Sequence, residues 1–407
     1  MSVASPPRLR PAPLRVLTAV PLCDGHDSAI VTINLELARH GAEVIYLGYH
    51  QAASAIARAA VQEDVHAVGL SSYNGGHRVF FREVRAQLRA RGAADIPIFG
   101  GGGGTITAAD ARVMQRSGVD RIFFAGTPLA EMTRAITGDY ARELRPDAKL
   151  RGDRALARAI TLAESRSGLR PDPRKTARQR TRSASFVVGV AGPGGAGKST
   201  LIDELAARFL RARRSRRLAI LANDPSHPET RGAILGDRVS ALYAQDERVF
   251  FRSLATRGSL TGLSAAAPAA IEILRRRGGF DLIFVESVGV GQESDPFRVF
   301  RQGEKLVDAV LFVLPPHYGG RIQLQKIALL DGADLVVLNK CDDPRASAAK
   351  AELGARLAAN GRNQLLHTTI AAQHRDPGTD ALCAAIGRLA GLESAGGEKP
   401  CHLCIGA

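Results

Sequence analysis

Residues 186–202 read FVVGVAGPGGAGKSTLI, and they determine the fold class of the second half of the chain. The apolar run Phe186–Val190 predicts a buried strand, and a helix is expected from Thr200 onward. Between them, Gly192–Ser199 match G-x-x-x-x-G-K-[ST], a loop whose glycines let backbone N–H groups wrap phosphates. The following helix is expected to add its positive N-terminal end. Strand, loop and helix in this register predict a P-loop nucleotide-binding domain.

A motif for base recognition follows a later strand. Residues 339–342 read NKCD and come directly after the apolar run Leu335–Leu338. N-K-x-D at a strand end is typical of GTPases, because the carboxylate of Asp342 can accept hydrogen bonds from N1–H and the exocyclic amine of guanine. Adenine does not offer this pair of donors. The motif predicts that the bound nucleotide is GTP or GDP.

A carboxylate between these motifs is expected to take part in Mg²⁺ binding. Glu286 and Gly289 take the places of Asp and Gly in the D-x-x-G motif of GTPases, after the apolar run 282–285. Such a carboxylate can hold Mg²⁺ through water, and the glycine N–H can contact the γ-phosphate. Lys198 is expected to reach the β- and γ-phosphates, and Ser199 to bind Mg²⁺. Lys198 and Glu286 are therefore the predicted catalytic residues for GTP hydrolysis.

The first 140 residues show a second α/β pattern. Short apolar runs alternate with amphipathic ones, which predicts a parallel, doubly wound sheet of flavodoxin-like size with helices on both faces. Ligands bind at the carboxyl edge of such a sheet. The expected strands of this first unit are Leu14–Val20, Glu43–Leu47, Ala67–Ser71, Ile96–Phe99 and Arg121–Phe124, and its expected helices are Ser28–His40, Ala52–Glu63, Arg78–Arg91 and Ala108–Ser117. The expected strands of the second unit are Phe186–Val190, Leu218–Ala222, Leu282–Val285, Ala309–Leu314 and Leu335–Leu338.

The net charge of +15, from 55 Lys+Arg and 40 Asp+Glu, is unevenly spread. Residues 142–182 hold thirteen basic and five acidic residues, which predicts a linker or helical connector, because aromatic residues that would indicate nucleic-acid binding are not interleaved. No apolar run is long enough for a membrane span, and five scattered cysteines exclude a disulfide scaffold. A reduced, cytoplasmic protein without membrane or nucleic-acid partners is expected. The predicted layout is a domain at 1–140, a linker at 141–185, a second domain at 186–392 and a tail at 393–407.

Three stretches connect the second domain to a known family. They are Asn223-Asp224-Pro225-Ser226, Gly236-Asp237-Arg238 and Glu286-Ser287-Val288-Gly289. Together they resemble the MeaB-like G-protein chaperones of adenosylcobalamin-dependent acyl-CoA mutases, over roughly residues 185–390. The resemblance implies that Ser199, Asp224, Asp237, Glu286 and Ser287 surround Mg²⁺, a hard cation that prefers oxygen ligands. The nucleotide-binding residues implied by motif and resemblance are Gly194, Gly195, Ala196, Gly197, Lys198, Ser199, Thr200, Arg238, Asn339, Lys340, Cys341 and Asp342, and Gln292 is a candidate for orienting water.

Three loops at the predicted carboxyl edge of the first sheet carry a related resemblance. Asp24-Gly25-His26 lies in the first loop, Ser71–His77 ends the third strand, and Gly100–Gly104 end the fourth. They resemble the D-x-H-x-x-G, S-x-x and G-G motifs of the cobalamin-binding domain in the same mutases. The resemblance implies that His26 is the lower axial ligand of cobalt, with Asp24 on its other ring nitrogen. The nucleotide tail of the cofactor is expected beside Ser71, Tyr73, Gly101 and Gly102. His77 is a weaker candidate for corrin contact, and His66 is expected to be structural.

A cobalamin domain followed by a G-protein chaperone is the domain order at the start of the fused isobutyryl-CoA mutase family. The resemblance implies a GTP-hydrolysing chaperone for adenosylcobalamin, which works with an acyl-CoA-binding mutase barrel on another chain as a homodimer or hetero-oligomer. Without such a barrel, we do not expect this polypeptide to isomerise an acyl-CoA. Two alternatives stay open: a piece of a fused radical isomerase, and a cobalamin sensor that binds GTP without turnover. The sensor stays open because Ser240 stands where this family usually has a second basic residue.

Overall fold

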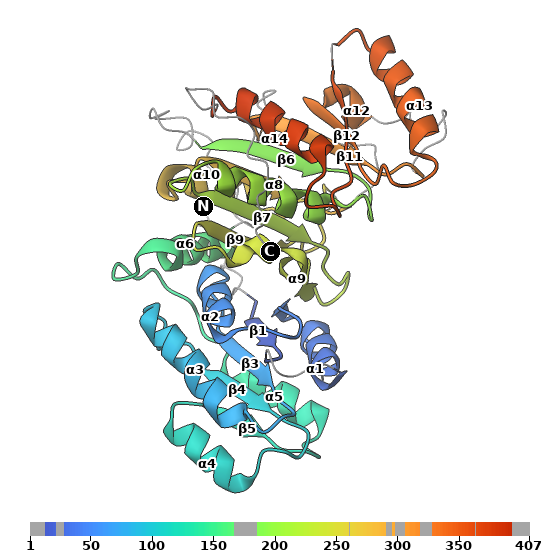
Figure 1. Cartoon of the computed structure of the whole chain (residues 1–407). Coiled ribbons are helices and arrows are strands. Elements are labelled where there is room, and N and C mark those ends of the chain that lie inside the picture. The colour runs from blue at the N-terminus through green and yellow to red at the C-terminus, as the bar shows by residue number, and fades with distance from the viewer. Residues whose placement is uncertain are drawn as a thin grey trace, which may run out of the picture.

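The computed structural model describes residues 13–21, 28–166, 185–259, 261–289, 295–297, 306–317, 328–362 and 364–392. Two wholly parallel sheets, each with helices packed against it, lie one above the other in Figure 1. Within these described ranges, no helix is long and apolar enough to cross a membrane. The α/β class predicted from the alternating apolar runs is confirmed.

Among the described residues, the first sheet has six strands and contains the flavodoxin-like order β5-β4-β3-β1-β2, with β8 added beside β2. Its strands, in that order, are β5 (Arg121–Phe123), β4 (Ile98–Gly101), β3 (Ala67–Ser71), β1 (Arg15–Ala19), β2 (Glu43–Tyr46) and β8 (Ala233–Leu235). The helices that cover it are α1 (Ser28–Arg39), α2 (Ala53–Gln62), α3 (His77–Ala90), α4 (Ala108–Arg116) and α5 (Leu129–Asp139). All five strands and four helices predicted for this region form, with ends shifted by one or two residues.

In the described part of the chain, the second sheet has seven strands in the order β13-β12-β11-β6-β10-β7-β9. These are β13 (Leu366–Thr368), β12 (Leu335–Leu338), β11 (Ala309–Leu314), β6 (Phe186–Ala191), β10 (Leu282–Glu286), β7 (Leu218–Asp224) and β9 (Val249–Ala255). The other elements of this half are α6 (Gly152–Arg166), α8 (Lys198–Ala212), α9 (Asp237–Ser240), η1 (Leu242–Gln245), α10 (Ala267–Arg277), α12 (Ala328–Gly332), α13 (Ala346–Ala359) and α14 (Pro377–Leu389). Because β6 is central, the loop after it faces the carboxyl ends of β10 and β11.

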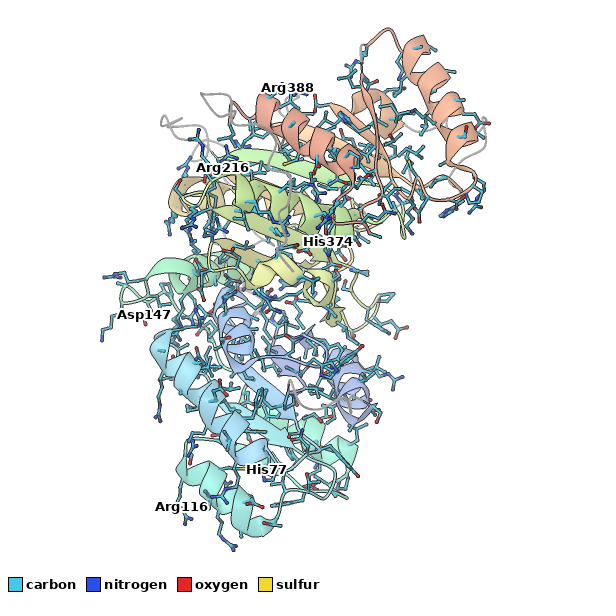
Figure 2. The ribbon with its side chains drawn as sticks, viewed as in Figure 1. His77, Arg116, Asp147, Arg216, His374 and Arg388 are labelled. Carbon is cyan, nitrogen blue, oxygen red and sulfur yellow. The ribbon has the colours of Figure 1, made fainter. Side chains whose placement is uncertain are left out.

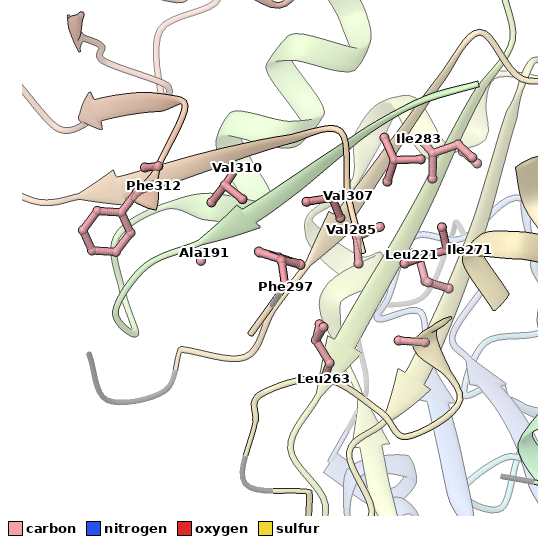
Figure 3. Packing of buried hydrophobic residues seen from close by; sticks show 14 of the residues in the cluster. Ala191, Leu221, Leu263, Ile271, Ile283, Val285, Phe297, Val307, Val310 and Phe312 are labelled. Carbon is pink, nitrogen blue, oxygen red and sulfur yellow. The ribbon is translucent and has the colours of Figure 1, made fainter. Parts of the chain in front are cut away.

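Buried apolar side chains fill both faces of the second sheet. On one face, Phe297, Val285 and Val310 belong to a cluster that also takes in residues of β7 and α10 (Figure 3). On the other face, α8 and α14 pack their apolar sides over the sheet. The strands read as nearly continuous apolar runs, which is what burial on both faces requires.

Part of the predicted linker belongs to this core. Leu156, Ala157 and Ile160 of α6 are buried in the same cluster as the strands of the second sheet. Helix α6 also packs against α10 and against α2 of the first unit. Residues 152–166 therefore form a packed helix at the junction of the two sheets, where Figure 1 shows α2, α6, α9 and β9.

Candidate nucleotide and cobalamin sites

The phosphate-binding loop lies between β6 and α8, as the sequence predicts. The ammonium of Lys198 is buried there and donates hydrogen bonds of 3.1 Å to the carbonyl oxygens of Gly192 and Pro193. Burial lowers the pKa of Lys198. Its present acceptors are neutral carbonyls, so phosphate oxygens would give this cation stronger, charge-assisted partners. The loop is thus arranged to receive an anion.

Gly289 lies directly against this loop. A side-chain carbon at Gly289 would be 2.4 Å from the backbone nitrogen of Gly194, so only glycine fits there. This contact brings the stretch after β10 to the loop that would hold the phosphates. It is the position at which a glycine N–H could contact a γ-phosphate.

Acidic side chains gather at the same edge of the sheet. Glu286 ends β10, Asp224 ends β7 and Asp237 begins α9. The hydroxyl of Ser199 donates a hydrogen bond of 2.7 Å to Glu286 Oε1. Burial, followed by repulsion from Asp237, raises the pKa of Glu286 to about 7. Burial also raises the pKa of Asp237 to about 6, although Lys198 opposes this shift.

Asp224 shows most clearly the electrostatic repulsion between these buried carboxylates. Burial, then repulsion from Asp237 and Glu286, raises the pKa of Asp224 well above its usual value. Within the described part of the chain, Asp224 Oδ2 and the buried hydroxyl of Ser287 lack a hydrogen-bond partner. A cation would relieve both the repulsion and the missing contacts, so the oxygen-only donor set fits Mg²⁺.

The carboxylates of Asp224, Asp237 and Glu286 do not surround one common metal position. Among the described residues, no three His, Cys, Asp or Glu side chains are close enough together to hold one metal ion. Mg²⁺ commonly keeps several waters and uses only one or two carboxylates together with substrate phosphates. The arrangement fits a Mg²⁺ ion bound largely through water and nucleotide, and it does not fit an all-protein metal cage.

The N-K-x-D motif links two parts of the nucleotide site. Asn339 is buried after β12, and its Nδ2 donates a hydrogen bond of 2.9 Å to the carbonyl of Ala196 in the phosphate-binding loop. Its Oδ1 accepts from the hydroxyl of Thr369 at 3.0 Å and from the backbone N–H of Ala371 at 3.1 Å. Asp342 is exposed nearby, where its carboxylate is free of burial cost. The motif therefore fixes the loop and also presents an acceptor for a base.

Sequence reasoning missed Thr369 and Ala371, which follow β13. The available signal was the short segment Thr369–Ala372, small apart from Ile370, after a three-residue strand. Such a strand is too short to give a clear alternating pattern. Cys341, which the motif includes, donates from Sγ to the carbonyl of Leu338 at 3.2 Å, and burial raises its pKa.

Arg238 has surroundings different from those expected of a nucleotide-binding residue. Its guanidinium is buried and donates to Glu63 Oε1 at 3.3 Å, to Gln62 Oε1 at 2.6 Å and to the carbonyl of Phe251 at 2.9 Å. Glu63 and Gln62 lie at the end of α2, in the first unit. The side chain is held at the junction of the two units, although the adjacent Asp237 belongs to the acidic group.

The carboxyl edge of the first sheet has a tightly packed glycine cradle. A side-chain carbon at Gly102 would be 1.8 Å from the carbonyl oxygen of Ser72, and one at Gly103 would be 1.9 Å from the ring of Tyr73. The N–H of Ser72 donates to the carbonyl of Gly101 at 2.9 Å, which ties the third and fourth loops together. The predicted residues Ser71, Tyr73, Gly101 and Gly102 are thus brought together.

Two hydroxyls at this edge lack partners. Among the described side chains, none forms a hydrogen bond with Thr18 Oγ1 on β1 or with Ser72 Oγ, and both atoms are buried. Unsatisfied buried hydroxyls beside a glycine cradle fit a polar ligand that enters between β1 and β3. Asp24 and His26, and likewise Gln292, lie outside the described residues.

His77, labelled in Figure 2, begins α3 beside this edge. Its Nδ1 is 3.2 Å from the carbonyl of Asn74, and its Nε2 is 3.7 Å from Asp110 Oδ2. His66 lies at the opposite edge, where its Nδ1 accepts from the N–H of Arg15 at 3.0 Å and its Nε2 is 3.0 Å from the carbonyl of Arg142. The expectation that His66 is structural is confirmed.

Comparison with known proteins covers both halves. The sequence model described as "Methylmalonyl Co-A mutase-associated GTPase MeaB" matches residues 156–398. The model of the B12 binding domain matches residues 14–132. The parallel α/β fold of each half is therefore assigned to a described domain type, with the B12-binding domain first and the P-loop GTPase domain second.

Individual relatives show the same two parts. The fused isobutyryl-CoA mutase of Geobacillus kaustophilus (strain HTA426) is 35% identical over 402 residues, which are 92% of this chain and 36% of that protein. The fused isobutyryl-CoA mutase of Nocardia farcinica (strain IFM 10152) is 39% identical over 347 residues, which are 81% of this chain and 31% of that protein. A protein of Pyrococcus abyssi (strain GE5 / Orsay) that is named as a putative GTPase is 42% identical over 210 residues, which are 51% of this chain and 61% of that protein.

The chain spans about a third of the length of the two curated mutase relatives. The match to the GTPase family alone covers more than half of the residues of this chain. Together with the preceding B12-binding domain, this match shows that the chain belongs to the MeaB family of methylmalonyl-CoA mutase-associated GTPases.

Proposed function

We propose that this chain is a GTP-hydrolysing, cobalamin-binding chaperone module for an adenosylcobalamin-dependent acyl-CoA mutase barrel of the isobutyryl-CoA or methylmalonyl-CoA type. The observation that carries the proposal is the grouping of four nucleotide elements at one sheet edge. The phosphate-binding loop, the acids of β7 and β10, and Asn339 all meet there. A glycine cradle with unsatisfied hydroxyls on the adjoining B12-binding domain supports the cobalamin part.

The proposed nucleotide chemistry rests on positioned charges. Lys198 exchanges its two carbonyl acceptors for β- and γ-phosphate oxygens. Ser199, Asp224, Asp237, Glu286 and Ser287 are the proposed Mg²⁺ set, and bound Mg²⁺ would neutralise charge on the transferring phosphate. The backbone of Gly194–Thr200 holds the phosphates, and Asn339–Asp342 select guanine. Burial of Lys198, Asp224 and Glu286 strengthens the electrostatic contacts that these three side chains make.

The proposed cobalamin contacts lie at the carboxyl edge of the first sheet. His26 is proposed as the cobalt ligand, with Asp24 fixing its ring, and bound adenosylcobalamin would supply a cobalt–carbon bond for radical chemistry in the mutase. Ser71, Tyr73, Gly101 and Gly102 are proposed to line the slot for the nucleotide tail. The closeness of Gly102 to Ser72 supports this slot, because a side chain there would block it.

The mutase relatives are about three times as long as this chain, and this length supports a partner barrel. We propose that a barrel on another chain, or a further domain, supplies the acyl-CoA site, in a homodimer or hetero-oligomer. In that assembly, this chain would be the chaperone part of a complete isomerase, so the two functions are compatible.

The proposed domain boundaries are 1–140 for the first domain, 141–185 for the linker, 186–392 for the second domain and 393–407 for the tail. Unpaired Cys341 and Cys383 support a reducing, cytoplasmic location.

Absorbance titration with adenosylcobalamin, in the presence and absence of GTP, tests the cobalamin half. A spectrum with displaced benzimidazole and a histidine ligand is expected for the wild type, and its loss is expected for His26→Ala. No spectral change at stoichiometric cofactor would contradict this half.

Phosphate release from GTP tests the other half. Lys198→Ala is expected to reduce the rate by about a hundredfold or more, because one positioned charge contributes on that order. Lys350→Ala on exposed α13 is the matched control and should leave the rate unchanged. Wild-type protein that binds GTP without turnover would instead favour the sensor alternative.

A further inference from the structure

One segment of the GTPase domain is a strand of the B12-binding domain. The chain leaves the second sheet at Asp224, joins the first sheet as β8, begins α9 at Asp237 and re-enters the second sheet as β9. Strand β8 pairs in parallel with β2, and Val44 lies opposite Ile234. Two proposed Mg²⁺ carboxylates thus bracket a strand that the other domain holds. Figure 1 shows α9, which follows this strand, at the junction of the two units.

The residue after Asp237 is fixed by the B12-binding domain. Arg238 is buried, and its guanidinium contacts Glu63 and Gln62 from α2 and the carbonyl of Phe251 from β9. The guanidinium carbon also lies 5.1 Å from the centre of the Phe251 ring, in cation–π geometry. Because Asp237 directly precedes Arg238, these contacts restrict where the carboxylate of Asp237 can lie.

The acceptors of Arg238 are themselves held rigidly. Glu63 Oε2 accepts from Arg15 at 2.8 Å, and both carboxylate oxygens accept from the N–H of Ser253 at 3.1 Å. Gln62 Nε2 donates to the carbonyl of Val249 and to Asp153 Oδ2, each at 2.8 Å. Such a buried network gives a single geometry, because loss of one member leaves a buried charge or amide unpaired.

We propose that Arg238, together with Gln62 and Glu63, positions Asp237 for Mg²⁺, so that the B12-binding domain completes the Mg²⁺ site of the GTPase. Arg238 is a positioning residue here, because its guanidinium is engaged at the junction by Gln62 and Glu63. This inference rests on the proposed function, since it requires that guanine nucleotide and Mg²⁺ bind. Its physical basis is preorganisation: a carboxylate that is already oriented loses less freedom when it binds a cation.

Two variants of the full-length protein test the anchor from both sides. Arg238→Gln removes the cation, and Gln62→Leu removes its acceptor on the B12-binding domain. The probe is a fluorescent GDP analogue, whose affinity is measured with Mg²⁺ and with EDTA. In both variants, the factor by which Mg²⁺ increases the affinity for GDP is expected to be about tenfold smaller than in the wild type. The affinity for GDP in EDTA should stay within about twofold of the wild-type value.

The matched control is Arg257→Gln. Arg257 belongs to the same junction, where it contacts Glu43 Oε1 at 2.7 Å and Glu164 Oε1 at 3.1 Å, but it follows β9 and lies outside the Asp224–Asp237 segment. It should lower the melting temperature and keep the full Mg²⁺ effect. Arg238→Lys, which retains a charge for Glu63, should recover part of the effect.

The outcomes separate the two proposals. A Mg²⁺ effect that persists in both Arg238→Gln and Gln62→Leu, or that falls equally in Arg257→Gln, would overturn the positioning role alone. If wild-type protein shows no Mg²⁺-dependent nucleotide binding, the proposed GTPase function fails and the inference fails with it. If one variant does not fold, the other decides, because they alter opposite sides of the junction.

Discussion

The hydroxyl of Ser199 lies 2.7 Å from Oε1 of Glu286 and donates a hydrogen bond to it. Both groups belong to the proposed Mg²⁺ set, so this bond occupies oxygens that a cation would share. The pKa of Glu286, raised to about 7 by burial and then by Asp237, shows that the negative charge is costly without a cation. A proton and a divalent cation therefore compete for the same carboxylate.

Replacing Glu286 by Gln tests this competition. The amide oxygen can still accept from Ser199, but the negative charge is lost, so Mg²⁺ affinity should fall by about tenfold or more. Calorimetric titration of Mg²⁺ into GDP-loaded protein measures the change. Glu272→Gln on α10, where Glu272 pairs with Arg276, should have no effect. Equal Mg²⁺ affinity in the Glu286→Gln protein would remove this residue from the set.

Base selection gives a second prediction. Asp342→Asn replaces two acceptor oxygens with a carboxamide, which presents an N–H to N1–H and the exocyclic amine of guanine. GTP affinity should fall by about a hundredfold, whereas xanthosine triphosphate, which has a carbonyl in place of that amine, should gain. Competition between the two nucleotides measures the switch.

The neighbouring carboxylate provides the control for that prediction. Asp343 accepts hydrogen bonds from the guanidinium of Arg345, at 2.9 and 2.7 Å, and from its backbone N–H at 2.9 Å, and these bonds hold the pKa of Asp343 below the usual range. Asp343→Asn should leave base preference unchanged. If both substitutions weaken GTP binding equally, the motif would be acting through loop structure and not through the base.

Features that depend on residues close together in the sequence could be predicted, whereas features that depend on contacts between distant residues could not. The P-loop and N-K-x-D motifs are local, and their residues follow strands whose apolar runs are clear, so their common edge could be predicted. The strand Ala233–Leu235 could not, because three apolar residues do not indicate which sheet they join. Likewise, the burial of Arg238 depends on Gln62 and Glu63, some 175 residues away in sequence.

The glycine cradle gives a third prediction. In Gly102→Ala, the new methyl group would lie 1.8 Å from the carbonyl of Ser72, so the third and fourth loops must move apart. Such overpacking should cost about 1–3 kcal/mol of unfolding free energy and abolish cobalamin binding. Gly138→Ala, on α5, has open space around the new carbon, so it should neither lower the unfolding free energy nor change cobalamin binding. Retained cobalamin affinity in Gly102→Ala would place the tail elsewhere.

The burial of His66 predicts how stability depends on pH. Burial lowers the pKa of His66 to about 4, and Nδ1 stays unprotonated because it accepts a hydrogen bond from the N–H of Arg15. The contact of Nε2 with the carbonyl of Arg142 opposes this shift. In the unfolded chain the pKa of histidine is about 6.5, so the unfolded state takes up a proton first as the pH falls. The stabilising contribution of neutral His66 is therefore complete above about pH 6.5 and is lost progressively toward pH 4.

Between pH 7.5 and pH 5.5, this residue alone should remove about 1.4 kcal/mol from the unfolding free energy. Urea denaturation at the two pH values measures the loss. His66→Gln should be less stable at pH 7.5, because one amide cannot replace both ring contacts, yet it should lose about 1.4 kcal/mol less than the wild type on acidification. An unchanged acid dependence in His66→Gln would show that the ring is protonated in the folded protein.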